Sequence, residues 1–147
     1  MWALSAKGSM RNISDEQALE FVSPFIGKAI SRVWQGNGSA IFLEVGELTE
    51  NKGELTIMIE WSWRVESFDE IIFGSFSDPS EFSENLDLLV GLTLNEISFQ
   101  SRLPEVVVAL SDDKWLCSFS TVEGDPEWAL ISPKNTLLSS KGSLGFE

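Results

Sequence analysis

The chain contains no histidine, no tyrosine and a single cysteine. Without histidine, neither Ser-His-Asp catalysis nor metal binding by imidazole is available. One thiol cannot form an internal disulfide or a cysteine-cluster zinc site, which is typical of proteins in a reducing compartment. Cys117 lies in an alternating apolar segment at 115–119, so we expect it to be a small buried residue. We therefore predict no catalytic residues, no cofactor and no metal.

Positive charge is also scarce, because the 147 residues include 23 acidic and only 10 basic side chains, a formal net charge of −13. Nucleic acid is an unfavourable partner, since binding it requires lysine and arginine to neutralise phosphates. No apolar run approaches the roughly 18 residues of a membrane span. The first residues lack the basic and apolar regions of a signal peptide. We expect a cytoplasmic protein without a membrane or nucleic-acid partner.

The acidic residues are unevenly distributed, and segment 65–101 contains no lysine or arginine. Two interpretations remain open for this segment. It is either a solvated surface that keeps the protein soluble, or a patch that steers a basic protein partner toward it. The predicted partner-binding acidic surface consists of Glu66, Asp69, Glu70, Asp78, Glu81, Glu84, Asp87 and Glu96.

Helix signals occur at two places and strand patterns fill most of the remaining chain. A capping box from Ser14 to Gln17 predicts a helix that ends near Gly27. Asp78 or Ser80 begins a second helix, which Gly91 ends. The predicted strands are 28–34, 40–46, 54–66, 70–76, 93–99, 105–111, 114–121 and 127–132. We predict an α+β fold dominated by strands, with antiparallel sheets and two main helices.

The clearest strand pattern covers residues 54–66, where every second residue from Leu55 to Val65 is apolar. A period of two over this length predicts one long strand with one buried face. Trp61 and Trp63 fall on that face, so we expect both to be structural core residues. Their large rings need wide packing partners, and each indole N–H needs an acceptor.

Arg64 is the lone cation among the 49 residues between Lys52 and Arg102. It shares the polar face of the predicted strand with Glu60 and Glu66. Two carboxylates beside an arginine are compatible with acid–base hydrolysis, but the same spacing suits surface salt bridges. We favour local pairing that fixes the strand register, and we assign Arg64 a structural role.

Two parts of the chain show the same order of elements. Each part begins with a capped helix that ends in glycine, and Gly27 and Gly91 are 64 residues apart. This order predicts a helix-plus-strands unit used twice, over about 14–76 and 80–132, although a chance similarity remains an alternative. We expect one globular domain at 1–133. Residues 134–147 lack a sustained period, and we expect a peripheral or disordered tail.

Several motifs within about residues 27–131 carry a resemblance to known sequences. They are the run 41–46, Gly53-Glu54-Leu55, Trp61-Ser62-Trp63-Arg64, Phe73-Gly74-Ser75, the run 89–91 and Glu127-Trp128-Ala129-Leu130. These motifs resemble segments of small bacterial proteins of uncharacterised function. Some similar proteins occur beside polymorphic toxins and are thought to be immunity proteins. The resemblance implies a fold and a genomic setting, and no catalytic residue.

Charge, residue types and resemblance together favour one functional class. We predict a non-enzymatic acidic binding protein, an immunity-type inhibitor of a basic partner. The six tryptophans and ten phenylalanines leave an alternative, which is a small-ligand module with an aromatic-lined cleft. The sequence also leaves open whether two copies pair as a homodimer through exposed sheet edges.

Overall fold

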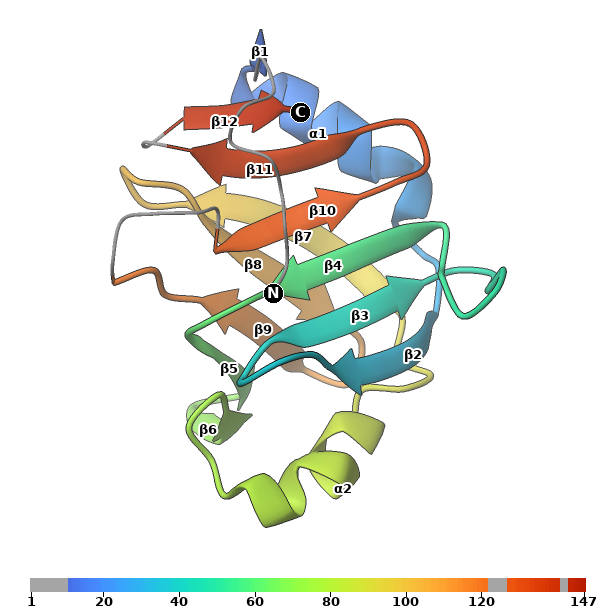
Figure 1. Ribbon diagram of the computed structural model, residues 1–147, viewed down its shortest axis with the longest axis vertical. Helices are drawn as coiled ribbons and strands as arrows, with labels where there is room; N and C mark the ends of the chain where they lie inside the picture. The colour runs from blue at the N-terminus through green and yellow to red at the C-terminus, as the bar shows by residue number, and fades with distance from the viewer. Residues whose placement is uncertain (1–10, 122–126, 141–142) are drawn as a thin grey trace.

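Two antiparallel sheets packed face to face form the body of the protein in the computed structural model (Figure 1). The structure describes residues 11–121, 127–140 and 143–147. The first sheet has the spatial order β1 (Arg11–Asn12), β12 (Ser143–Phe146), β11 (Thr136–Ser140), β10 (Trp128–Ile131), β4 (Leu55–Ile59), β3 (Ile41–Val45) and β2 (Ile30–Gln35). The second has the order β6 (Glu70–Gly74), β5 (Trp63–Ser67), β9 (Lys114–Ser118), β8 (Glu105–Leu110) and β7 (Leu94–Gln100). The predicted strand-dominated α+β fold is confirmed.

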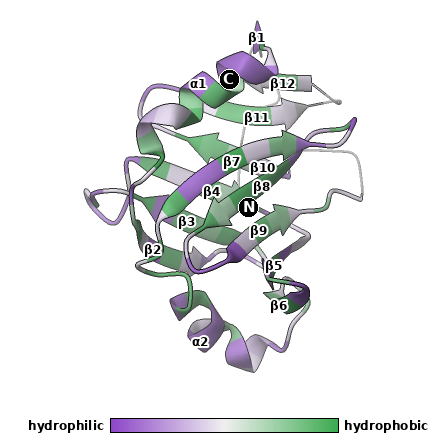
Figure 2. Ribbon diagram, turned by 180° about the vertical axis from the view of Figure 1, so that it is seen from behind, coloured by the Kyte–Doolittle hydropathy of each residue, from purple (hydrophilic) through white to green (hydrophobic). Residues whose placement is uncertain are grey.

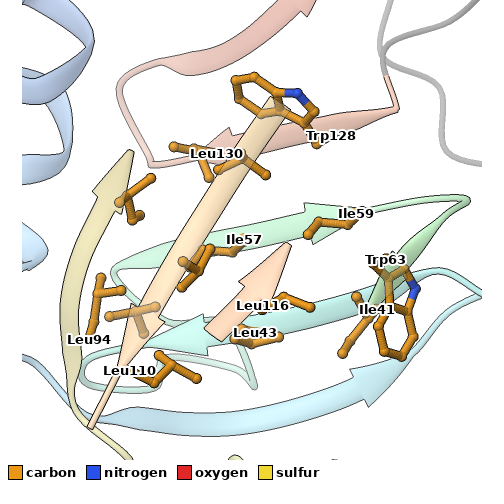
Figure 3. Close-up of a cluster of buried hydrophobic side chains, with 14 of the residues drawn as sticks. Ile41, Leu43, Ile57, Ile59, Trp63, Leu94, Leu110, Leu116, Trp128 and Leu130 are labelled. Atoms are coloured by element: carbon orange, nitrogen blue, oxygen red, sulfur yellow. The ribbon is translucent and has the colours of Figure 1, made fainter. Parts of the chain in front are cut away.

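The hydrophobic core fills the space between these seven- and five-stranded sheets. Side chains alternate along each strand, so one face of every sheet contributes to the core. Leu43 and Ile57 from the first sheet meet Leu116 and Leu110 from the second, and Trp128 closes one side (Figure 3). Burying each large aliphatic side chain contributes about 1.5–3 kcal/mol, and this term dominates the stability of the fold.

Two short helices lie near opposite ends of the longest axis (Figure 1). Helix α1 (Asp15–Val22) has the predicted capping box, with Ser14 accepting from the Gln17 backbone, and continues into the 3-10 turn η1 (Ser23–Phe25). Helix α2 (Phe82–Asp87) follows the 3-10 turn η2 (Pro79–Glu81), which Asp78 caps. Each helix buries apolar residues against the core.

The predicted single strand at 54–66 is wrong, because the chain crosses from one sheet to the other in this segment. Strand β4 ends at Ile59 in the seven-stranded sheet, and β5 begins at Trp63 in the five-stranded sheet. Trp61 lies in the crossover and is 61% exposed, so its predicted place in the core is also wrong. An even number of positions separates Ile59 from Trp63. The apolar alternation therefore continues across the break and hides it.

Residues 134–147 do not form the peripheral or disordered tail that we predicted. They contain β11 and β12, which join β1 to the seven-stranded sheet. Leu137 packs in the main core, whereas Leu138 packs in a second cluster on the outer face of the same sheet. A strand with both faces buried has no alternation of apolar and polar residues, so the period of two was absent here.

The two halves of the chain occupy equivalent places in the fold. In the first half, β2, β3 and β4 form a meander in the seven-stranded sheet, and β5 and β6 cross to the other sheet. In the second half, β7, β8 and β9 form a meander in the five-stranded sheet, and β10 and β11 cross in the opposite direction. The pairs β4–β10 and β5–β9 join the halves, one in each sheet.

Hydrogen bonds between the halves are reciprocal, as in a two-fold interface between identical subunits. The N–H of Gly27 donates to the carbonyl of Leu94 at 2.7 Å, and the N–H of Gly91 donates to the carbonyl of Ile30 at 2.8 Å. Both glycines have positive φ, at 93° and 88°. Gly27 and Gly91 therefore occupy equivalent places in this hydrogen-bonding pattern.

Candidate functional site

The outer face of the five-stranded sheet is hollowed into a groove of about 490 Å³. Figure 2 views the molecule from the side of this sheet. We call this hollow the outer groove. Its lining consists of Arg64, Glu66, Phe68, Glu96, Ser98, Gln100, Ser101, Glu105, Val107, Ala109, Trp115, Cys117, Ser118 and Phe119. Most of these residues alternate along their strands with core residues, so the sheet itself positions their side chains.

The corresponding face of the seven-stranded sheet has a different character. It carries a second apolar cluster in which Phe42, Met58, Ala129 and Leu138 are buried. The Trp34 ring stacks on Phe42 with a centroid separation of 3.9 Å. The outer face of the seven-stranded sheet thus contains a buried apolar cluster, whereas the outer face of the five-stranded sheet has polar and aromatic side chains around an open groove. The open face is the stronger candidate for binding.

The strand registers show one position at which the two faces differ. In β10 and β4, Ala129 lies opposite Met58, directly after Trp128. At the equivalent place in β5 and β9, Arg64 lies opposite Cys117, directly after Trp63. Alanine therefore occupies this position in the seven-stranded sheet. Arginine occupies it in the five-stranded sheet, and its guanidinium lies in the groove.

The outer groove carries a net negative charge, because Glu66, Glu96 and Glu105 line it together with one cation, Arg64. The Nε atom of Arg64 donates to Oε2 of Glu66 at 2.6 Å, a local pairing of the kind that the sequence predicted. The Arg64 guanidinium carbon also lies 4.6 Å from the centre of the Phe119 ring. The lining thus combines carboxylates with an aromatic face.

Other carboxylates around the groove are held by hydrogen bonds. Glu105 accepts from the hydroxyl of Ser118 at 2.7 Å and from the backbone N–H of Ser120 at 2.7 Å. Burial raises the pKa of the Glu127 carboxyl, and the charges of Glu105 and Glu60 raise it further. These contacts fix Glu105 at one end of the groove.

Cys117 is buried, as predicted, and contributes to the floor of the outer groove. Burial raises the pKa of its thiol to about 11, and the nearby Glu66 carboxylate acts in the same direction. The thiol is therefore protonated at neutral pH, whereas a nucleophilic cysteine requires the thiolate. This environment suits a packing role for Cys117.

The eight acidic residues of the predicted partner surface do not lie together. Glu66 and Glu96 line the outer groove, whereas Asp69 lies in the turn between β5 and β6 and Glu70 begins β6. The other four, Asp78, Glu81, Glu84 and Asp87, belong to η2, α2 and their cap. Asp78 accepts hydrogen bonds from Ser80, which lower the pKa of the Asp78 carboxyl. The acidic segment therefore contributes to at least two separate surfaces.

Sequence reasoning missed several groove residues. Glu105, Trp115 and Phe119 follow the cation-free segment, so its boundary at Ser101 excluded them. The sequence placed all three residues on predicted strands, but it did not show which strands pair with one another. Glu60 lies in the crossover before β5, so Glu60 and Glu66 do not share the single strand face on which a carboxylate pair was considered.

Comparison with known proteins gives no match to a family model, a curated protein or a solved structure. Within the described ranges, no group of three or more acidic or cysteine side chains is arranged to hold a metal ion. No helix in the described part of the chain is long and apolar enough to cross a membrane. The geometry and charge of the outer groove are therefore the main indications of function.

Proposed function

We propose that the protein is a non-enzymatic binding protein whose outer groove holds a positively charged segment of a partner protein. One observation carries this proposal. The face of the five-stranded sheet forms an open groove lined by carboxylates and aromatic rings, whereas the equivalent face of the other sheet carries a buried apolar cluster. An inhibitor that covers a basic surface of its partner would also fit the resemblance proposed from the sequence motifs within residues 27–131.

Charge and aromatic rings would make different contributions to such binding. Carboxylates increase the rate of association with a basic partner, and the net charge of −13 adds a long-range attraction. Most of the affinity in protein interfaces comes from a few buried anchors, often aromatic. Trp115 and Phe119 lie in the groove, and Phe68 at its edge is 76% exposed. These rings supply surfaces on which a partner side chain can pack.

A second candidate function is the binding of a small ligand in the same groove. Its volume of about 490 Å³ is within the roughly 300–1,000 Å³ typical of small-molecule sites. An uncharged aromatic ligand would stack on Trp115 and Phe119. Its affinity would respond little to salt, whereas binding of a basic segment weakens as ionic strength rises.

The proposal predicts that charge in the groove matters more than charge elsewhere. The double variant Glu66→Gln, Glu96→Gln should weaken binding of a fluorescent nine-residue arginine–glycine peptide by about tenfold at low salt. Two exposed acids of α2 and its cap provide the matched control, Glu81→Gln with Glu84→Gln. Fluorescence anisotropy measures both affinities.

The control variant removes the same number of negative charges, so long-range attraction falls equally in both proteins. Equal losses of affinity in the two variants would show that only the net charge attracts the peptide. That result would contradict a specific role for the groove. A larger loss in the groove variant, together with weaker binding at high salt, is the expected result.

A further inference from the structure

Arg64 makes two contacts in the outer groove that proteins commonly use to recognise an arginine. Its Nε atom donates a charge-assisted hydrogen bond of 2.6 Å to Glu66, and its guanidinium lies over the Phe119 ring at 4.6 Å. A planar guanidinium forms both contacts at once, because its N–H groups bind a carboxylate while its face stacks on a ring. The groove thus already holds one arginine side chain, its own.

The fold does not require an arginine at this position. The equivalent residue in the other half is Ala129, which lies opposite Met58 and follows Trp128 just as Arg64 follows Trp63. Both residues lie at the same position in an antiparallel pair, β10 with β4 and β5 with β9. A role for Arg64 beyond structure is therefore consistent with its place in the groove.

The contacts of Arg64 are weak enough to exchange with those of a ligand. The Arg64 side chain is 40% exposed, and ion pairs at this level of exposure are screened by solvent. Among the described residues, Glu96 and Glu105 form no ion pair, so the groove has negative charge left for a further cation. These carboxylates can attract a second guanidinium to the groove, where it then competes with Arg64 for Glu66 and Phe119.

We propose that Arg64 is a built-in competitor, and that an arginine of the partner displaces it from Glu66 and Phe119. This inference rests on the proposed function, because it names the side chain that the groove selects. Arginine is favoured over lysine, since an ammonium group has neither the fork nor the flat face of a guanidinium. The displaced Arg64 side chain moves out into solvent, to which it is already partly exposed.

The experiment compares Arg64→Gln with the native protein, using one arginine–glycine peptide and one lysine–glycine peptide of equal length. Removing the competitor should strengthen binding of the arginine peptide by about fivefold. Loss of one positive charge also attracts both peptides more strongly. The expected result is therefore a larger gain for the arginine peptide than for the lysine peptide.

Arg32→Gln is the matched control, because Arg32 also stacks on an aromatic ring, Trp34, but on the other sheet. It changes the net charge equally and should leave the preference for arginine unchanged. Phe119→Leu should reduce that preference, since the stacking surface is lost.

The following outcomes would overturn the inference that Arg64 is a competitor. Equal gains for the two peptides, or a gain in Arg32→Gln as large as in Arg64→Gln, would show a simple charge effect. If these results occur while Glu66→Gln with Glu96→Gln still weakens binding, the groove remains the site and only the competitor is refuted. If neither the native protein nor Arg64→Gln binds either peptide, both the competitor and the proposed function fail.

Discussion

Replacing Trp128 with alanine should lower the free energy of unfolding by about 3–5 kcal/mol. Trp128 is 1% exposed and stacks on Phe99 with a centroid separation of 5.6 Å. Its indole N–H donates to the carbonyl of Pro104 at 3.1 Å. The alanine variant therefore loses a large buried surface, leaves a cavity and leaves the Pro104 carbonyl without this donor.

The same change at Trp63 should have a similar effect, because the two residues are equivalent in the two halves. Trp63 is also buried, packs edge-on against Phe73, and donates its indole N–H to the carbonyl of Ser39 at 2.6 Å. Urea denaturation followed by circular dichroism measures both losses without relying on tryptophan fluorescence.

Trp61→Ala is the control for these two variants, because Trp61 lies in the exposed crossover. Its effect on the free energy of unfolding should stay within about 0.5 kcal/mol. A loss at Trp61 as large as the loss at Trp128 would contradict the crossover between the sheets. It would favour the single long strand that the alternating sequence suggested.

After the two tryptophan variants, Glu44→Gln should be the most damaging change that we predict, with a loss of about 1–3 kcal/mol. The Glu44 side chain is 1% exposed, and both of its carboxylate oxygens accept hydrogen bonds. One oxygen accepts from the Trp34 indole at 2.7 Å. The other accepts from the Gly53 backbone at 3.0 Å and from the hydroxyl of Thr56. An amide replaces one of these acceptors with a donor.

Glu47→Gln is a suitable comparison, because Glu47 is exposed in the loop after β3. Urea denaturation should show no more than about 0.5 kcal/mol of change for this variant. If Glu44→Gln is equally harmless, then the buried donors around Glu44 find other partners. That outcome would contradict the role of this carboxylate in joining β3 to β4.

Local sequence signals were sufficient for much of the fold. The capping box at Ser14 located the start of α1, and Asp78 located the start of η2, because caps act over one turn of chain. The predicted end of the second helix at Gly91 is wrong, because α2 ends at Asp87. Alternation located most strands but failed where the chain changed sheets between Ile59 and Trp63. It failed again at Leu137 and Leu138, where burial on both faces removes the period. These features depend on tertiary packing, which no local pattern encodes.

The candidate site was less accessible from the sequence. Arg64 drew attention through its isolation among acidic residues, and the structure places it in the groove beside Glu66. The groove itself depends on the pairing of β5 with β9 and of β9 with β8, which brings together residues far apart in the chain. Glu105 and Phe119 therefore could not be assigned to the site before the register was known.

The most direct test of the central claim is to map where an arginine–glycine peptide binds on the isotopically labelled protein by NMR. Amide shifts should change most in β5, β7, β8, β9 and at Phe119, the segments that form the outer groove. Shifts in α2 should change little. Changes that centre on α2 or on the outer face of the seven-stranded sheet, or no changes at all, would contradict the groove as the binding site.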